Sequence, residues 1–529
     1  MKNFGEETNN ISHKKMEYSL SNSLYFLLII FTVGIIIRIY YLPFDLPVIL
    51  DAQNYFWYGN DMSILKQIPI EYDAHNNLWS SILSIFFSVN LSNNILDFMN
   101  MQRMLSTIIS ALTIFPVFFL CKKFFPNKYS LLGASFFIFE PRLIINSLQG
   151  ITEPIYLLIG ILIILFSLNE NKKFYYISFG LAAIFSLIRY EGLLILLPLT
   201  IIYFWKFKIN KESVLKYGLC LLIFTLVIFP MVETRIQATG EDGLTSHILG
   251  GTNYISNTLI GNQEKQDKTE FFNNGVLNTI KFLGWITIPM WLIFLPYGIF
   301  KYFRKFNQKK GILLLFSVVL ILPALYAYSR DFQETRYLYI LFPLLSVISL
   351  YSIQKIDKVI NFKIIFTLII IGVIFSSIGW LEYKWIDEEY EKEAFMLSLK
   401  IKEITNGINA FYPESTYFQF IDLDKKFPDL KSQIKNEHKL ILTDKYENIE
   451  EFLVNEEENG LTHIVIDESQ KQDNLRKKFL IEIYENENNY NFLKKIYDSN
   501  DEGFNYKLKI FKINYDLFDE HIKIINKFN

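Results

Sequence analysis

The sequence predicts a polytopic α-helical membrane protein with an α/β domain at its C-terminal end. Of its 529 residues, 51% are hydrophobic, and the apolar residues form blocks of about membrane-spanning length. Residues 381 to 529 hold 31 acidic and 21 basic side chains, a net charge of −10, so the whole-chain charge of −2 leaves +8 on the remainder. We therefore expect two parts that lie in different solvents.

The first apolar block, residues 23 to 42, is predicted to be a retained membrane anchor. It is too long for the apolar region of a secretory signal, and no small-x-small cleavage site follows it. The predicted organisation is an N-terminal tail over residues 1 to 22, a membrane bundle over 23 to 380, and a C-terminal domain over 381 to 529.

Apolar length predicts eleven spans in the bundle. They are placed near residues 23 to 42, 103 to 121, 129 to 148, 152 to 168, 174 to 188, 191 to 205, 216 to 232, 279 to 300, 311 to 328, 336 to 352 and 363 to 380. The stretch LWSSILSIFFSV, residues 78 to 89, is too short to cross a bilayer and is predicted to be an interfacial helix.

The loops between these spans alternate in charge. One set is rich in lysine, and the positive-inside rule places that set in the cytoplasm. The N-terminal tail then lies in the cytoplasm. The chain is then predicted to be a multi-pass protein of the plasma membrane. Its outer loops, 43 to 102 and 233 to 278, and its C-terminal domain lie on the extracytoplasmic side.

Arginines and acids gather at the outer ends of the spans. The arginines are Arg38, Arg142, Arg189, Arg235, Arg330 and Arg336, and the acids are Asp51, Glu140, Glu153, Glu191, Glu233, Asp331 and Glu334. Charges at membrane depth usually face a cavity or a partner, so we expect a shared polar site on the outer face. The alternative is that each of them pairs locally or snorkels to the lipid headgroups.

The third span supports an outer cavity. Its clean apolar part, YSLLGASFFIF, has only 11 residues, too few to cross alone, and Pro141 follows soon after it. Backbone broken at membrane depth is tolerated where protein or a wet cavity satisfies it. We therefore expect a helix break at Glu140, Pro141 and Arg142.

Four short segments resemble a known family. They are ILDAQNYFWYG with Asp51, SLQGITEPIYLL with Glu153, SLIRYEGLLILLPL, and TRYLYILFPLL. Together with the topology they resemble the GT-C glycosyltransferases, most nearly the prokaryotic dolichyl-phosphate-mannose mannosyltransferase-like family, glycosyltransferase family 39. Many relatives have an acidic pair where this chain has Asp51 followed by Ala52, which leaves the metal requirement and the acceptor class open.

The resemblance implies an activity and its substrates. Members of the family move a sugar from a polyprenyl-phosphate carrier to an acceptor hydroxyl on the outer face. The acceptor class, whether protein, glycan or lipid, stays open. No glycine-rich phosphate loop lies in a strand-to-helix setting, which agrees with a lipid-linked donor. We expect the donor, the acceptor and membrane lipids as partners, and no nucleic acid.

Asp51 is the predicted general base for the acceptor hydroxyl, and the alternative is that it anchors the first outer loop. Asp61, on the same loop, is the lower-ranked candidate. The predicted ligands of the donor phosphate are Arg336, Arg189 and Arg142.

Glu153 is predicted either to orient the acceptor or hold a metal, or to cap the helix that begins beside Pro154. Further substrate-site candidates are Glu140, Glu191 and Tyr337. His75 and His247 lie on outer loops. No cofactor is assigned, and a divalent metal ion stays open.

The C-terminal domain is predicted from short apolar runs. HKLILTD, THIVIDE and YKLKIFKIN read as strands, with a helix over residues 474 to 497. This domain would bind the acceptor or serve as a lid, and loop 233 to 278 would also act as a lid. The alternative functions are a lipid or glycan transporter or flippase, and a polymerase or ligase of surface polysaccharide.

Overall fold

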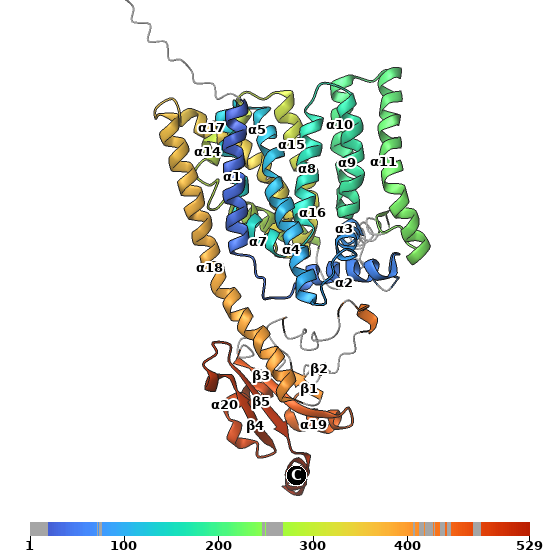
Figure 1. Cartoon of the computed structure of the whole chain (residues 1–529), viewed down its shortest axis with the longest axis vertical. Helices are drawn as coiled ribbons and strands as arrows, with labels where there is room; N and C mark the ends of the chain where they lie inside the picture. The colour runs from blue at the N-terminus through green and yellow to red at the C-terminus, as the bar shows by residue number, and fades with distance from the viewer. Residues whose placement is uncertain are drawn as a thin grey trace, which may run out of the picture.

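The structure is a computed structural model of the whole chain. It describes residues 20–70, 72, 77–245, 249, 268–405, 408–411, 417, 427, 429–433, 440–441, 446–468 and 478–528. A helical bundle stands above a small mixed α/β domain, and one long helix, α18, joins them (Figure 1). The start of α1 and the C-terminal domain lie at opposite ends of the bundle.

The bundle and α18 supply most of the helices. They are α1 Leu20–Tyr40, α2 Leu50–Leu65, α3 Asn77–Phe87, α4 Ile95–Leu112, α5 Ile114–Lys122, α6 Asn127–Ile138, α7 Pro141–Leu148, α8 Glu153–Ser167, α9 Lys173–Ile188, α10 Leu196–Phe207, α11 Lys211–Thr239, α13 Lys268–Ile286, α14 Leu295–Arg304, α15 Gln308–Leu320, α16 Leu322–Ser329, α17 Phe342–Ile356 and α18 Phe362–Ile404, with the 3₁₀ helices η1 Tyr190–Ile195 and η2 Thr335–Leu341.

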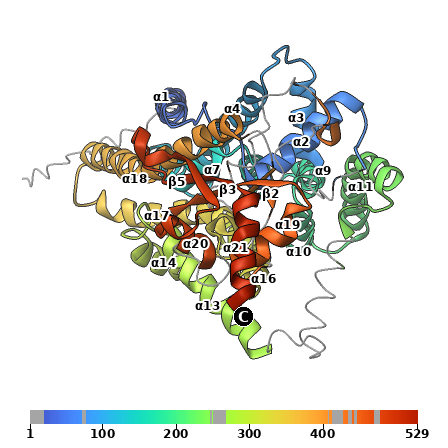
Figure 2. The same ribbon diagram turned by 90° about the horizontal axis from the view of Figure 1, so that it is seen from below.

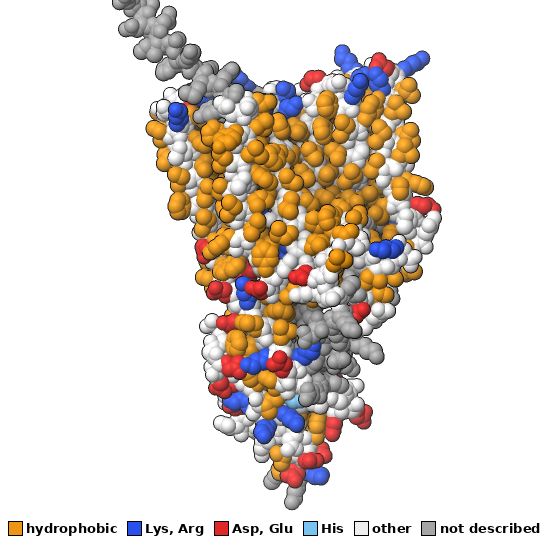
Figure 3. Space-filling model, viewed as in Figure 1, with side chains coloured by type: hydrophobic (Ala, Val, Ile, Leu, Met, Phe, Trp, Pro, Cys, Tyr) orange, Lys and Arg blue, Asp and Glu red, His pale blue; other side chains and the backbone are white. Residues whose placement is uncertain are grey.

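On the face of the bundle seen in Figure 3, apolar side chains form a broad band, and lysine and arginine side chains gather at the end far from the C-terminal domain. Among the described residues, seven helices are long and apolar enough to cross a membrane, or eight if α6 and α7 form one bent span. The predicted spans at α8 and α9 have only 15 and 16 helical residues. The chain is thus a multi-span membrane protein, as predicted from its composition.

The predicted break in the third span is confirmed. Helices α6 and α7 meet at an angle of 49°, and Pro141 is the first residue of α7. The buried guanidinium of Arg38 on α1 donates to the carbonyl of Ile138 at 2.9 Å, which supplies a partner at the end of α6. A second break was not predicted. The span expected over 279 to 300 is two helices, α13 and α14, because Pro289 has no N–H and disfavours helix at the residue before it.

The first outer loop folds into two helices. The expected helix at residues 78 to 89 is confirmed as α3, and it packs against α2, which was not predicted. Trp79, Leu83 and Phe87 of α3 are buried in a small core that they share with Phe56 and Phe98. This core lies at the end of the bundle that faces the C-terminal domain, and it holds α2 in place.

The C-terminal domain is built on a five-stranded mixed sheet with the order β2-β1-β3-β5-β4. Its described elements are β1 Ile408–Phe411, β2 Leu440–Ile441, α19 Ile449–Glu457, β3 Leu461–Asp467, α20 Lys478–Glu485, β4 Leu493–Asp498, β5 Leu508–Ile513 and α21 Tyr515–Phe528, with 3₁₀ turns at η4 Lys431–Gln433, η6 Glu487–Asn489 and η7 Ser499–Glu502. Strand β1 runs parallel to β2 and β3, while β5 runs antiparallel to β3 and β4. The predicted helix over 474 to 497 is wrong over its last part, since β4 pairs there with β5.

Helix α18 is the link between the two parts. Its 43 residues would extend about 65 Å, twice the apolar thickness of a bilayer. Ala394, Leu397 and Ile401 near its end pack against one face of the sheet, beside Val465 and Leu508. The expected domain boundary at residue 381 therefore falls inside a continuous helix.

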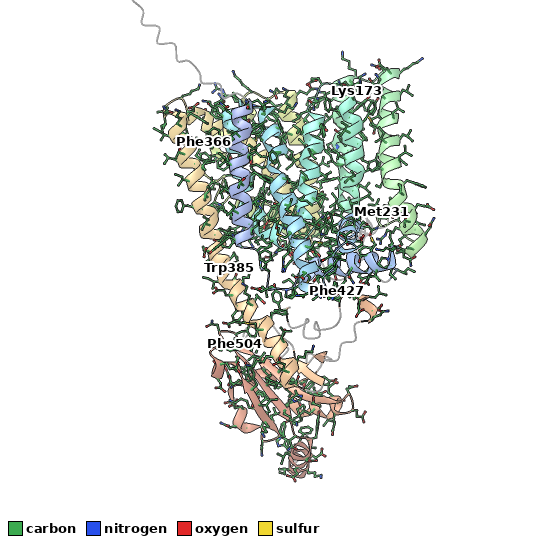
Figure 4. All side chains as sticks on the ribbon, viewed as in Figure 1. Lys173, Met231, Phe366, Trp385, Phe427 and Phe504 are labelled. Carbon is green, nitrogen blue, oxygen red and sulfur yellow. The ribbon has the colours of Figure 1, made fainter. Side chains whose placement is uncertain are left out.

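The chain also returns from the domain to the bundle. Phe427 lies among Phe56, Trp57 and Phe98 of the small core, and Figure 4 shows it directly below α2. Seen from below, the sheet and its helices lie over the end of the bundle (Figure 2). The C-terminal domain therefore covers the end of the bundle that carries the predicted site.

Candidate active site

Six charged side chains from four segments form one connected network at the end of the bundle that faces the C-terminal domain, and one of them, Glu334, pairs with Nε of Arg336. Arg336 Nη1 lies 2.7 Å from Asp51 Oδ2 and 3.7 Å from Glu153 Oε1. Arg189 continues the network, with Nη1 2.7 Å from Glu153 Oε1 and Nη2 2.9 Å from Glu191 Oε1. Residues that are up to 285 positions apart in the sequence therefore meet around two guanidinium groups.

Local sequence places the two main carboxylates at helix starts. Asp51 lies in the first turn of α2 and Glu153 opens α8, where free N–H groups and the helix dipole favour negative charge. Leu50, just before Asp51, has a φ of 53°, a left-handed conformation that is unfavourable for a leucine. The side chain of Asp51 is 50% exposed, whereas that of Glu153 is 5% exposed.

The two arginines come from short 3₁₀ segments that end or begin spans. Arg189 has extended backbone between α9 and η1, and Arg336 lies in the first turn of η2. The tight turn after Arg189 requires Gly192, because a Cβ there would lie 2.6 Å from the carbonyl oxygen of Phe185. Both guanidinium groups are thus held at the edge of the bundle by local backbone geometry.

A cavity of about 590 Å³ opens beside this network. It is lined by Asp51, Arg336 and Glu334 and also by Trp385 and Glu388 of α18. A much smaller pocket of about 30 Å³ lies beyond Arg336, lined by Glu153, Arg189, Glu191 and Tyr337. Arg336 borders both spaces, so a ligand in the large cavity can contact it directly.

No protein-family model and no curated protein matches the chain. Solved structures do. ArnT from Cupriavidus metallidurans bound to undecaprenyl phosphate aligns with a TM-score of 0.54 and 8% identity, over 93% of this chain and 98% of ArnT. The Archaeoglobus fulgidus oligosaccharyltransferase in its apo form aligns with a TM-score of 0.52 and 10% identity, over 84% of this chain and 70% of the enzyme. The same enzyme tethered to an acceptor peptide with the NVT sequon gives 0.50 and 11% over 91% and 74%.

The chain has the GT-C fold. The predicted fold is thereby confirmed, together with the sheet domain after the bundle. The nearer resemblance to the dolichyl-phosphate-mannose mannosyltransferase-like family stays a prediction.

The structure brings together five of the predicted site residues in the ion-pair network and places a sixth beside them. Asp51, Glu153, Glu191, Arg189 and Arg336 belong to the network, and the Tyr337 ring lies 5.8 Å from the Arg336 guanidinium and 5.9 Å from that of Arg189.

Arg142 and Glu140 lie elsewhere in the GT-C fold. They pair with each other at 2.9 Å, and both are buried at the break between α6 and α7. Arg142 also donates to the carbonyls of Ile288 at 2.5 Å and Trp285 at 3.0 Å, and it lies over the Trp380 ring at 4.6 Å. Neither residue lines either pocket, and the contacts of Arg142 join α7 to the end of α13 and to the turn that follows it.

Asp61 is also separate from the network. It lies ten residues after Asp51 on the same helix, about 15 Å along its axis. It accepts hydrogen bonds from the Tyr72 hydroxyl at 2.7 Å and from the backbone N–H of Lys431 at 3.1 Å. These contacts attach α2 to the segment that returns from the C-terminal domain.

Sequence reasoning missed several residues that shape the large cavity. Arg103 of α4 is buried and donates to the carbonyls of Pro43, Leu46 and Pro47, which fixes the start of the first outer loop. Glu388 of α18 lines the same cavity. An arginine at the head of an apolar span was a usable signal for Arg103, whereas nothing in the sequence places α18 beside Asp51.

Within the part of the chain that the structure describes, no three His, Cys, Asp or Glu side chains gather closely enough to hold a metal ion. His75 and His247 lie outside the described residues. Asp51 and Glu153 are each paired with arginine, so the described residues do not form a donor set for a metal.

Proposed function

We propose that this protein is a membrane glycosyltransferase that moves a sugar from a polyprenyl-phosphate carrier to an acceptor hydroxyl at the extracytoplasmic face. The observation that carries this proposal is the position of Arg336. It contacts a half-exposed carboxylate, Asp51, and borders a cavity of about 590 Å³. A base and a cation for an anionic leaving group therefore lie side by side within a space that admits substrate.

The fold supports the proposal. The ArnT structure with the same fold contains undecaprenyl phosphate, and a structure of the oligosaccharyltransferase carries an acceptor peptide. By analogy, the donor here is a polyprenyl-linked sugar. A hexosyl group, and mannose within that class, is the sugar that the sequence resemblance favours.

In the proposed reaction Asp51 accepts the proton of the acceptor hydroxyl while that oxygen attacks the anomeric carbon of the donor sugar. The bond between this carbon and the phosphate oxygen breaks, and the polyprenyl phosphate leaves with the electron pair. A positioned base contributes about 10²- to 10⁴-fold in rate. The leaving phosphate needs stabilised charge rather than a proton, and Arg336 supplies it, with Arg189 behind it.

The ion pairs of Arg336 also couple donor binding to the state of Asp51. In the structure its Nη1 contacts Asp51, which lines the large cavity, and Glu153, which lines the small pocket. A donor phosphate that binds Arg336 competes with Asp51 for the guanidinium, which leaves the carboxylate oxygen open to the acceptor hydroxyl. Glu153 stays paired with Arg189 at 2.7 Å and holds the second arginine in position.

The network lies at one end of the bundle, beside the C-terminal domain, and this favours transfer over the transport alternative. The test is to incubate the purified protein in lipid with a panel of radiolabelled polyprenyl-phosphate sugars and a membrane extract. The proposal predicts covalently labelled acceptor and free polyprenyl phosphate in equal amounts. Labelled glycolipid that crosses the bilayer without a covalent change would contradict it and support transport.

A further inference from the structure

A buried amide joins the two helix starts that carry the site carboxylates. Gln102 of α4 has no exposed surface. Its Nε2 donates to the carbonyl of Ala52 at 2.9 Å and to the carbonyl of Gly150 at 2.8 Å. One NH₂ group therefore uses both of its hydrogens, one on each segment.

The two carbonyl groups that accept these hydrogen bonds belong to residues close in sequence to the site carboxylates. Ala52 follows Asp51, and Gly150 lies three residues before Glu153. Both carboxylates meet Nη1 of Arg336, at 2.7 and 3.7 Å. The spacing between the carboxylates is therefore set by two backbone segments that Gln102 ties together.

The surroundings hold this amide in place. Trp79 Nε1 donates to the same Gly150 carbonyl at 3.0 Å. Gly150 has a φ of 79°, and a Cβ there would lie 2.9 Å from Cγ of Gln102. The amide thus packs directly on a turn that only glycine fits without strain.

On the other side of the amide, the strained backbone of Leu50 comes just before Asp51. Strained backbone persists only where neighbouring contacts hold it. The bond from Gln102 to Ala52 is one such contact.

We propose that Gln102 is a positioning residue for the transfer reaction, which fixes the Asp51 carboxylate relative to Glu153 and Arg336. This inference rests on the proposed function. It requires a carboxamide, because leucine has no donor and an ionised glutamate would place negative charge against two carbonyl oxygens. A displacement of about 1 Å at a reacting group can reduce the rate about 10²-fold.

The activity test compares Gln102→Leu with the wild type under saturating donor and acceptor. The expected result is a kcat about 10- to 100-fold lower, with KM for both substrates changed by less than about threefold, since Gln102 lines neither cavity. Trp79→Phe, which removes only one bond to Gly150, should lower kcat by less. An unchanged kcat in folded Gln102→Leu would overturn the proposal.

Two controls separate positioning from general stability. Tyr302→Phe removes a buried hydrogen bond, to the Lys310 carbonyl, away from the site. Gln237→Leu makes the same change of residue type at an exposed position of α11. If Tyr302→Phe lowers kcat as much as Gln102→Leu does at equal loss of thermal stability, the positioning role is wrong.

A second measurement does not depend on catalysis. Spin labels are attached at the exposed positions Asn54 and Gln149, through Asn54→Cys and Gln149→Cys, and their distance distribution is measured by pulsed electron resonance. Gln102→Leu should broaden the distribution, and Gln237→Leu should leave it narrow. An unaltered distribution would refute the positioning role even if the protein transfers sugar, whereas a broadened distribution with no transfer by the wild type would refute only the proposed function.

Discussion

Replacing Arg336 with lysine tests whether this residue binds the donor phosphate through its planar fork. Nη1 of the guanidinium pairs with Asp51 and Glu153 and its Nε pairs with Glu334, whereas an ammonium offers only one centre of charge. Arg336→Lys keeps the positive charge, but the ammonium can pair well with only one of these oxygen partners. The loss is about one charge-assisted hydrogen bond, about 1.5–3 kcal/mol.

That energy corresponds to about a 10- to 150-fold decrease in kcat/KM for the donor. The assay varies the concentration of a polyprenyl-phosphate sugar at fixed acceptor and follows release of polyprenyl phosphate. The control is Arg330→Lys, the same replacement at an exposed arginine at the end of α16. If Arg336→Lys and the wild type show the same donor kcat/KM, the assignment of Arg336 to the phosphate is refuted.

Three further predictions concern the site and the two parts of the fold. Arg142→Met should cost about 3–5 kcal/mol of folding stability, because it leaves the buried carboxylate of Glu140 unpaired. Adding Glu140→Gln should recover much of this loss in thermal melts. A raised KM for the donor in folded Arg142→Met would contradict the structural role. Gly192→Ala should lower both thermal stability and kcat, because its Cβ would meet the Phe185 carbonyl at 2.6 Å and displace Arg189; wild-type values of both would show that the turn can adjust. Burial, with a contribution from the charge of Lys512, lowers the pKa of His463 in β3 below 6.5. The stability that neutral His463 contributes is therefore present above pH 6.5 and is lost as the pH falls below 6.5. His463→Gln should flatten the profile of melting temperature against pH in this range, and an unchanged slope would refute the prediction.

The sequence was most informative about the position of charged groups along the membrane normal. Sorting lysines to one side and arginines with acids to the other depends on topology alone, and the network of Arg336, Asp51, Glu153 and Arg189 lies where that sorting placed it. The choice among the arginines depends on tertiary packing. Arg142 resembles Arg189 in the sequence, yet its guanidinium is taken up by Glu140 and two carbonyls.

Helices and strands were missed where local pattern was weak. Helix α2, with the sequence LDAQNYFWYGNDMSIL, mixes aromatic and polar residues without a clear period, and it forms because α3 and Phe427 bury its aromatic side chains. The sequence predicts helix at β4 because LKKIYD is short and follows a helical stretch. It forms a strand because it pairs with β5, and the local sequence does not show this pairing. Gln102 gave no signal, since a glutamine near the start of a span resembles any interfacial residue.

The central claim is that Asp51 is the base in a sugar transfer, and one measurement tests it most directly. Wild type, Asp51→Asn and Asp45→Asn, the last an exposed aspartate of the same outer loop, are reconstituted in lipid and assayed with the labelled donor panel and membrane extract. The account predicts transfer by the wild type and Asp45→Asn, and a loss of about 10²-fold or more in folded Asp51→Asn. Wild-type transfer by folded Asp51→Asn would contradict it.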